Sequence, residues 1–375
     1  MTRDLIVFGE DWGRHPSSTQ HLIRHLSNDR RVIWVNSIGM RRPKLSRADA
    51  GRALSKIAGA VRRPRKQTPV PVPENMTVIN PLAVPLPGNR AAARINRAVL
   101  GRKVRRAVEM QGLREPLMWA SLPTAVDLAG ACGDRDLVYY CGDDFGALAG
   151  VDHQPVTACE ERLAAKADVI FAASETLAQR FDGSKTFHLP HGAHIDLFSR
   201  PAPRAHDLPT HGPIAGFYGS LSDWLDQDLV AACAARLPEW TFVFIGDERT
   251  DLERLKSLPN VQFLGPRAHE KLPCYVQHWD ASLLPFVDNA QIRACNPLKL
   301  REYLAAGRPI VATPFPAVRA YADHIKQAGD VRTFAAAIEI CRSETDVHRQ
   351  RRQKSVETES WQARADEVRA HIDRL

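Results

Sequence analysis

Short runs of consecutive apolar residues recur along this chain, and each is followed by a loop and a stretch with helical spacing. The run Leu5–Phe8 leads into a glycine-containing loop, and Ile214–Gly219 does the same much later in the chain. Uninterrupted runs of this length are typical of strands that are buried on both faces of a parallel sheet. Strands that alternate with helices therefore predict an α/β fold with Rossmann-like parallel sheets.

The pattern starts twice, which predicts two domains. Residues 199–212 are rich in proline, alanine and histidine and show no periodicity, as expected of a linker. A chain of 375 residues is also long for one hydrophobic core. We therefore expect an N-terminal Rossmann-like domain over residues 1–198, a C-terminal one over 213–355, and a final helix over 356–375. One face of this helix carries Trp361, Ala365, Val368 and Ile372.

Composition limits where the protein could reside. The chain contains no apolar run of about 18 residues, so no transmembrane helix is predicted. Its first residues run straight into a strand and lack the apolar core of a signal peptide, which predicts a cytoplasmic protein. The seven cysteines contain no CxxC pair, which favours free thiols over a disulfide framework or a zinc site.

Basic residues are concentrated in two segments. Between Arg41 and Lys66 there are ten Lys/Arg residues and one acidic residue, and a second basic run extends from Arg90 to Arg106. Apolar residues recur at helical spacing within 41–66, which predicts a basic amphipathic helix. Such a helix could lie on an anionic membrane surface or pack its apolar face on the domain. The candidate membrane contacts are Arg41, Arg42, Arg62 and Arg63.

A capped helix with features of an anion site is expected after residue 296. Asn296 suits the N-cap, Pro297 suits the first helical position, and Gly307 ends the helix. A helix start attracts anions, Lys299 adds a cation in the first turn, and Glu302 lies on the same face. A cation for phosphate and a carboxylate for ribose hydroxyls would suit a nucleoside diphosphate; the alternative is an ordinary helix with a surface Lys–Glu pair.

Two common enzyme classes lack their motifs here. A dinucleotide-binding dehydrogenase would need GxGxxG after the first strand, and this motif is absent from the loop that follows Leu5–Phe8. No GxSxG sequence supports acyl transfer by a serine nucleophile.

The stretch from Asn296 to Thr313 resembles the donor-site helix of GT-B glycosyltransferases, in particular glycosyltransferase family 4 and its bacterial polysaccharide relatives of the teichuronic-acid type. Further stretches resemble this family in the same order, over about residues 135–315; they are Glu160–Ser174, His191–Phe198, Gly216–Leu221 and Leu258–Gly265. The resemblance implies two Rossmann-like domains facing a cleft, with the C-terminal helix crossing back to the first domain.

The resemblance also implies roles for the loops of the second domain. The loop after Gly219 would approach the diphosphate, the segment Gly265–Arg267 would border the base, and the start of the helix would hold the diphosphate, with Glu302 at the ribose. The candidate donor-binding residues are Gly219, Ser220, Gly246, Gly265, Pro266, Arg267, Arg293, Asn296, Pro297, Leu298, Lys299 and Glu302.

The sequence departs from the family pattern at two places. Family 4 commonly has a glutamate eight residues before Glu302, where this chain has Ala294, and Asp288 is the candidate replacement. The family also commonly has Arg and Lys after the first glycine loop of this domain, whereas residues 220–226 contain no cation. Lys299 and Arg293 are therefore expected to carry more of the phosphate charge.

The loops after two strands of the first domain supply the candidate catalytic residues. Asp143 or Asp144 could accept a proton from the acceptor hydroxyl, and the alternative is a turn with solvated carboxylates. His15 could touch the donor sugar, and Gly13 and Arg14 are candidate acceptor contacts. No metal is expected, because in the resemblance the histidine-rich stretch 191–196 is a turn before the linker.

We therefore expect a retaining hexosyltransferase that moves a sugar from a nucleotide-diphosphate sugar to a saccharide or lipid-linked acceptor, in bacterial surface or exopolysaccharide biosynthesis. The nucleotide sugar is a substrate, and no cofactor or nucleic acid is expected. Peripheral attachment to the inner face of the plasma membrane is a further expectation. The alternatives are a nucleotide-sugar epimerase of the same fold and a non-catalytic basic module that binds an anionic polymer or nucleic acid.

Overall fold

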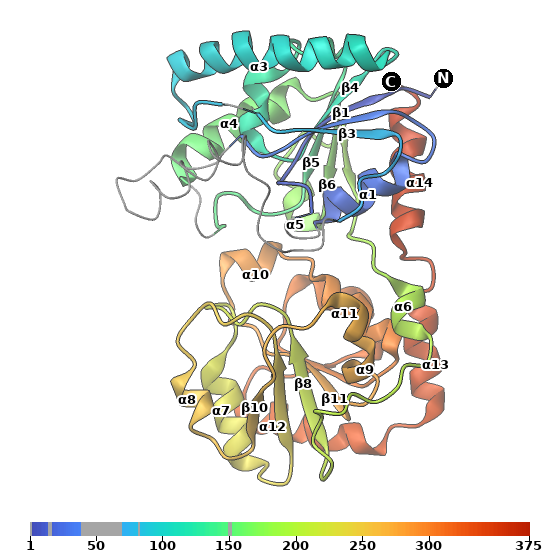
Figure 1. Ribbon diagram of the computed structural model, residues 1–375. Coiled ribbons are helices and arrows are strands. Elements are labelled where there is room, and N and C mark those ends of the chain that lie inside the picture. Colours follow the sequence, from blue (N-terminus) through green and yellow to red (C-terminus); the bar gives the residue numbers. More distant parts are fainter. Residues whose placement is uncertain (1, 14–16, 39–69, 82, 149–151) are drawn as a thin grey trace. The chain divides into compact units, whose positions relative to one another are not determined.

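A computed structural model of the chain describes residues 2–13, 17–38, 70–81, 83–148 and 152–375. The basic segment 41–66, which includes the four candidate membrane arginines, lies outside the described residues, as do Arg14 and His15. The chain forms two compact units, Met1–Pro190 with Arg364–Leu375, and His191–Ala363 (Figure 1).

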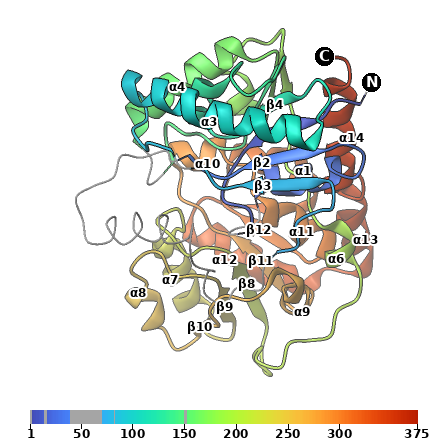
Figure 2. The same ribbon diagram turned by 45° about the horizontal axis from the view of Figure 1, so that its top comes forward.

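The first unit is built on a seven-stranded parallel sheet with the order β3-β2-β1-β4-β5-β6-β7. Its strands are β1 Leu5–Phe8, β2 Val32–Val35, β3 Met76–Ile79, β4 Leu117–Ala120, β5 Leu137–Cys141, β6 Val169–Ala172 and β7 Thr186–His188. Its helices are α1 Ser18–Leu26, α3 Arg90–Gln111, the 3-10 helix η1 Pro123–Leu128, α4 His153–Lys166, α5 Glu175–Ala178 and most of α14 Trp361–Ile372. Figures 1 and 2 both show α3 beside α4, and α1 beside α14.

Helix α14 completes the first unit although it is the last helix of the chain. The four residues predicted to share its buried face are buried, which confirms that prediction. The guanidinium of Arg30, which is fully buried, pairs with Asp373 at 3.1 Å and with Asp29 at 2.9 Å. Asp29 in turn pairs with Arg369 of α14 at 2.7 Å. Apolar burial and an ion-pair network around buried Arg30 therefore hold the end of the chain against the start of the first unit.

The second unit is built on a six-stranded parallel sheet with the order β10-β9-β8-β11-β12-β13. Its strands are β8 Ile214–Tyr218, β9 Thr241–Ile245, β10 Val261–Phe263, β11 Ala281–Leu284, β12 Ile310–Ala312 and β13 Lys326–Gln327. Its helices are α6 Ile195–Ser199, α7 Gln227–Arg236, α8 Glu253–Lys256, η2 His269–Lys271, α9 Pro273–Val276, α10 Ala290–Ala294, α11 Leu298–Ala306, η3 Pro316–His324, α12 Val331–Ile340, η4 Cys341–Ser343 and α13 Asp346–Ser355. Two parallel α/β units confirm the predicted fold class.

The boundary between the units falls after Pro190, upstream of the expected linker at 199–212. The chain that follows Pro190 packs with the second unit, because Phe198 and Leu208 enter its core. The side-chain amide of Gln277 also donates to the carbonyl oxygens of Phe198 and Arg200, both at 2.7 Å. The segment is thus anchored by apolar burial and hydrogen bonds. Across the described parts of the chain, no helix is long and apolar enough to cross a membrane.

Candidate functional site

Three glycines meet where the neighbouring strands β8, β9 and β10 of the second unit end. The Gly219 amide donates to Ile245 at 2.8 Å, and the Gly246 amide donates to Gly265 at 3.1 Å. Gly246 has a φ of +153°, and a Cβ atom there would lie 1.8 Å from the carbonyl oxygen of Gly219. Only glycine fits this approach. The carboxyl ends of parallel strands are where open α/β sheets bind ligands, so these loops frame a candidate site.

Lys299 brings a positive charge to the same loops. Its ammonium lies 5.2 Å from the ring centre of Phe217 and 5.6 Å from that of Phe286. A Cβ atom on Gly219 would come within 2.9 Å of the ammonium, so the charge lies directly against that loop. Burial lowers the pKa of Lys299, although nearby Cys295 and Glu302 oppose the shift. No ion pair involves Lys299 within the described residues, so a bound anion would stabilise its charged form.

The start of α11 differs from the prediction. The N-cap is Pro297, with an extended ψ of 126°, and the helix begins at Leu298, so the prediction of Asn296 as N-cap is wrong. Asn296 lies one residue earlier, and its side-chain oxygen accepts a hydrogen bond from Arg301. The N-cap residue, Pro297, makes no side-chain hydrogen bond to the start of this helix. The positive end of a helix favours an anionic group.

Glu302 is buried at the centre of a polar cluster. Its side chain is 6% exposed; one carboxylate oxygen pairs with Nε2 of His269 at 2.6 Å, and the other accepts from the Tyr218 hydroxyl. Burial by itself lowers the pKa of His269, but the Glu302 carboxylate outweighs this and the pKa is raised. Burial and the same carboxylate raise the pKa of Tyr218, which keeps its hydroxyl protonated as a donor. Two fixed donors therefore orient Glu302.

Sequence reasoning missed both partners of Glu302. Tyr218 carries a detectable signal, because it is the last residue of a predicted strand and directly precedes the predicted loop glycine. His269 carries none: it begins a 3-10 helix of three residues, 33 positions from Glu302.

Other candidate donor residues are already engaged. Arg267 donates to Asp207 at 2.7 Å and to the Tyr275 hydroxyl at 2.9 Å, and Pro266 precedes it. Arg293 binds both carboxylate oxygens of Asp288, at 2.6 and 2.7 Å, on the exposed surface. Ser220 is exposed and Leu298 is half-buried. The structure thus gathers the glycines, Lys299 and Glu302, whereas the two arginines are bound to neighbouring acids.

The paired aspartates of the first unit have different surroundings. Both follow β5, but Asp144 accepts from Arg180 at 2.8 Å and from the Gly146 amide at 3.0 Å. Arg180 also pairs with buried Glu160 at 2.7 Å, which makes Asp144 part of a structural network. Asp143 is exposed and belongs to no ion pair within the described residues.

The loop after β1 carries two further residues of interest, Gly13 and Glu10. Gly13 has a φ of +75°, and its amide donates to Gln20 at 3.1 Å. The carboxylate of Glu10, which was not predicted, accepts from the Ser17 hydroxyl at 2.8 Å. Burial raises the pKa of Glu10, and the nearby charges of Asp143 and Asp11 add to the shift.

Within the described residues, no group of three His, Cys, Asp or Glu side chains is arranged to hold a metal ion.

Comparison with known proteins gives matches in sequence. Residues 212–343 match the family model described as "Glycosyl transferases group 1". The protein described as "Putative teichuronic acid biosynthesis glycosyltransferase TuaH" from Bacillus subtilis (strain 168) is 26% identical over 271 residues, which cover 65% of this chain and 68% of the relative.

Solved structures also match over nearly the whole chain. HepE from Anabaena, solved in complex with UDP, has a TM-score of 0.68 at 16% identity and covers 99% of this chain and 100% of its own. Sucrose-phosphate synthase from Thermosynechococcus elongatus has a TM-score of 0.71 at 15% identity, and the match covers 99% of this chain and 98% of the synthase chain. At such identities the similarity concerns the fold, and it extends to both units of the chain.

Proposed function

We propose that this chain, a glycosyltransferase of the GT-B fold, transfers a hexose from a UDP-sugar to a saccharide acceptor, either lipid-linked or part of a growing polysaccharide. The observation that carries the donor assignment is the half-buried ammonium of Lys299, which lies against the Gly219 loop without a carboxylate partner among the described residues. UDP is the proposed diphosphate because HepE was solved with UDP and with UDP-glucose. The name of the Bacillus relative supports a role in cell-surface polysaccharide synthesis.

The proposed chemistry at the donor is stabilisation of the leaving diphosphate. Negative charge develops on the diphosphate as its bond to the sugar breaks, so a preorganised cation lowers the barrier. Lys299 lies in the first turn of α11, so its charge and the positive end of the helix are at one place. Gly219 and Gly246 let the backbone approach closely because neither carries a side chain. No step in this scheme requires a metal ion or a cofactor.

Glu302 is proposed to accept hydrogen bonds from the ribose hydroxyls. Both of its oxygens already have a donor in the protein, but an ionised carboxylate has about four acceptor positions. Tyr218 and His269 therefore orient the group without exhausting it.

Asp143 is the proposed base for the acceptor hydroxyl, because Asp144 is held by Arg180. Retention of the anomeric configuration is part of the proposal and rests on the resemblance to family 4. Assignment of the product anomer by NMR tests it, and an inverted product would remove that part.

Attachment to an anionic membrane surface is supported by α3. This 22-residue helix carries seven Arg/Lys residues and one acidic residue, Glu109. Ile95 and Val99 lie one turn apart and are 52% and 57% exposed. Arg102 and Arg106 on the same helix are exposed and form no ion pair within the described residues. Exposed apolar side chains among cations are typical of helices that lie at a membrane interface.

Vesicle sedimentation tests the membrane assignment. The full chain should bind phosphatidylglycerol vesicles and leave phosphatidylcholine vesicles unbound, because each cation near an anionic surface contributes about 1 kcal/mol. Val99→Ser should weaken this binding, whereas Val347→Ser, which changes an equally exposed valine of α13, should not. Equal binding to both kinds of vesicle would contradict an electrostatic membrane site.

The central experiment is calorimetric titration of UDP and other nucleoside diphosphates into the full chain, followed by incubation with UDP-glucose. UDP binding that Lys299→Met abolishes would support the donor site. Conversion of UDP-glucose into another nucleotide sugar without an acceptor would favour the epimerase. Failure of every diphosphate to bind would overturn the proposed function.

A further inference from the structure

A polar pocket lies at the amino ends of strands β11 and β12 of the second sheet. It has a volume of about 390 Å³ and begins beside Asp280 and Pro309, the residues that precede β11 and β12. The glycine loops of the candidate donor site follow the carboxyl ends of strands, so the two sites are at different ends of the sheet. A volume of this size is within the range of small-molecule sites.

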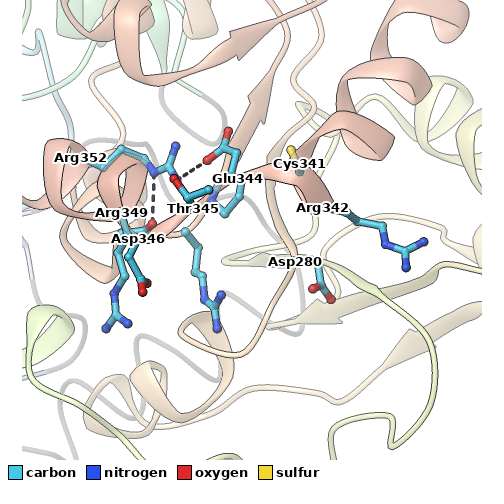
Figure 3. A pocket seen from close by; sticks show the side chains of 11 residues that line it. Asp280, Cys341, Arg342, Glu344, Thr345, Asp346, Arg349 and Arg352 are labelled. Atoms are coloured by element: carbon cyan, nitrogen blue, oxygen red, sulfur yellow. Dashed lines mark hydrogen bonds and ion pairs between the residues drawn. The ribbon is translucent and has the colours of Figure 1, made fainter.

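Four arginines and three acidic residues are among the side chains that line this pocket. The residues are Asp280, Gly307, Arg308, Pro309, Cys341, Arg342, Glu344, Thr345, Asp346, Arg349 and Arg352. Figure 3 shows Arg349 and Asp346 from the start of α13 together, with Arg342 and Asp280 in another part of the view. These side chains come from well-separated stretches of the sequence, so the fold alone brings them together.

One of the four arginines has a structural role. Arg352 is buried, pairs with Glu344 and donates from Nε to the Gly307 carbonyl oxygen at 3.1 Å. Glu344 also pairs with Lys326. In this cluster each cation has the Glu344 carboxylate as a partner, and Glu344 and Arg352 line the pocket.

The guanidinium groups of Arg308 and Arg349 are different. Arg308 uses Nε to bind the Gln277 carbonyl oxygen at 2.5 Å, and within the described residues neither arginine forms an ion pair. Both side chains are half-buried. The stem of Arg349 crosses Gly307 so closely that a Cβ atom there would be 2.5 Å from its Cγ. The remaining N–H groups of these arginines are therefore held near the pocket by fixed stems.

The electrostatics of the pocket favour an anion. Burial lowers the pKa of Arg308, and the nearby charges of Arg349 and Arg352 lower it further, while Asp280 and Asp346 oppose the shift. Like charges held together outside bulk water are costly unless an anion joins them. Guanidinium groups match phosphate oxygens with paired hydrogen bonds.

The acidic side chains narrow the ligand class. An ionised carboxylate only accepts hydrogen bonds, so Asp280 and Asp346 could accept from hydroxyl groups but would repel a second phosphate. Asp280 already accepts from the Ile214 amide at 2.8 Å, which fixes its orientation. A ligand with one phosphate and several hydroxyls satisfies both kinds of side chain. The lining offers no aromatic ring for a nucleobase to stack on.

We propose that this pocket binds a phosphorylated sugar, with Arg308 and Arg349 holding the phosphate and Asp280 and Asp346 accepting from its hydroxyls. The site is independent of the donor site proposed above. No group is transferred in it, so the proposal concerns binding alone.

Calorimetry with glucose 1-phosphate tests the proposal. The full chain is first saturated with UDP, and the sugar phosphate is then titrated, with D-glucose as the neutral control. We expect glucose 1-phosphate to bind and glucose not to bind. Arg308→Gln and Arg349→Gln should each weaken binding at least about tenfold, because each removes a charge-assisted contact to phosphate. The control is Arg351→Gln, which changes an exposed arginine of α13 that does not line the pocket. This variant should bind glucose 1-phosphate like the wild type.

The variants also separate failure of this site from failure of the donor site. Lys299→Met, titrated without UDP, should bind glucose 1-phosphate like the wild type even if it no longer binds UDP. Loss of sugar-phosphate binding in Lys299→Met, or normal binding in both pocket variants, would overturn the proposal. So would the absence of any binding to the wild type. Circular dichroism and thermal unfolding of each variant show whether a loss reflects misfolding, and Arg308→Lys, which keeps the charge, should retain part of the affinity.

Discussion

Replacement of Lys299 by methionine separates two effects of this lysine: its effect on the free energy of unfolding and its contribution to the affinity for a ligand. Methionine keeps an unbranched apolar stem against Phe217 and Phe286 but removes the charge. Burial lowers the pKa of Lys299, so the folded protein binds its proton more weakly than the unfolded chain does. The charged lysine therefore destabilises the ligand-free fold at neutral pH, and this cost is relieved as the pH rises toward 10.5. The variant should melt at the same temperature as the wild type or higher.

The same substitution should weaken UDP binding strongly. Opposite charges about 4 Å apart interact by about 4 kcal/mol at an effective dielectric constant of about 20. Part of this is lost because the diphosphate gives up water, so we expect a net loss of about 3 kcal/mol, or roughly 150-fold in affinity.

Calorimetry of UDP binding and thermal unfolding of the free protein are the two measurements. A ligand at 100 times its dissociation constant adds about 2.7 kcal/mol of stability, so the wild type should show a clear thermal shift with UDP and the variant almost none. Lys354→Met, at an exposed lysine of α13, is the control and should change neither quantity. If Lys299→Met binds UDP normally, the lysine is not the phosphate cation. If it loses stability in proportion to affinity, its role is structural.

Three further substitutions test the geometry. His269→Ala removes a partner of Glu302. The pKa of His269 is raised above 6.5 in the folded protein, so the His269–Glu302 pair stabilises the fold by roughly 1 kcal/mol. This stabilisation is complete below pH 6.5 and is lost as the pH rises through the folded pKa of His269. Urea unfolding across pH 6 to 8 should show this decline in the wild type and not in the variant, and parallel profiles would refute it. Asp373→Ala deprives fully buried Arg30 of a partner and should cost about 2 kcal/mol in thermal unfolding, while an unchanged melting temperature would argue that Asp29 suffices. Gly246→Ala would place a methyl group 1.8 Å from the carbonyl oxygen of Gly219. UDP binding should therefore be lost, and the free energy of unfolding should fall by about 3 kcal/mol. Normal UDP affinity in a calorimetric titration would contradict the proposed role of this loop.

The strands were the part of the fold that the sequence predicted best. Strand β1 has the predicted bounds, Leu5–Phe8, because strands buried on both faces need uninterrupted apolar residues. Strand β13, Lys326–Gln327, has no such residues and was not predicted. Its two residues pair with β12 only because the preceding chain brings them to the sheet edge.

The candidate site was predictable only in part, for a physical reason. Gly246 and Lys299 follow from local rules, because a glycine loop after a strand and a cation in a first helical turn are visible in a short window of sequence. The pairing of Glu302 with His269 depends on how η2 packs beside α11, and nothing near either residue indicates the other. The start of α11 was misplaced because an Asn-Pro pair suits an N-cap and first turn, whereas Pro297 itself adopts the extended cap conformation.

The way the chain crosses between its units has a consequence for synthesis. Arg30 is translated early, but its partner Asp373 is 343 positions away. The first unit therefore cannot close its ion-pair network or cover the face that α14 buries until the second unit has been made. Domains usually fold as units while the chain emerges from the ribosome, but pairing of distant segments is slow because the loop between them must first be closed. On the ribosome, the second unit should reach its native state before the first. The nascent first unit should expose apolar surface in the meantime, a state in which it would depend on chaperones.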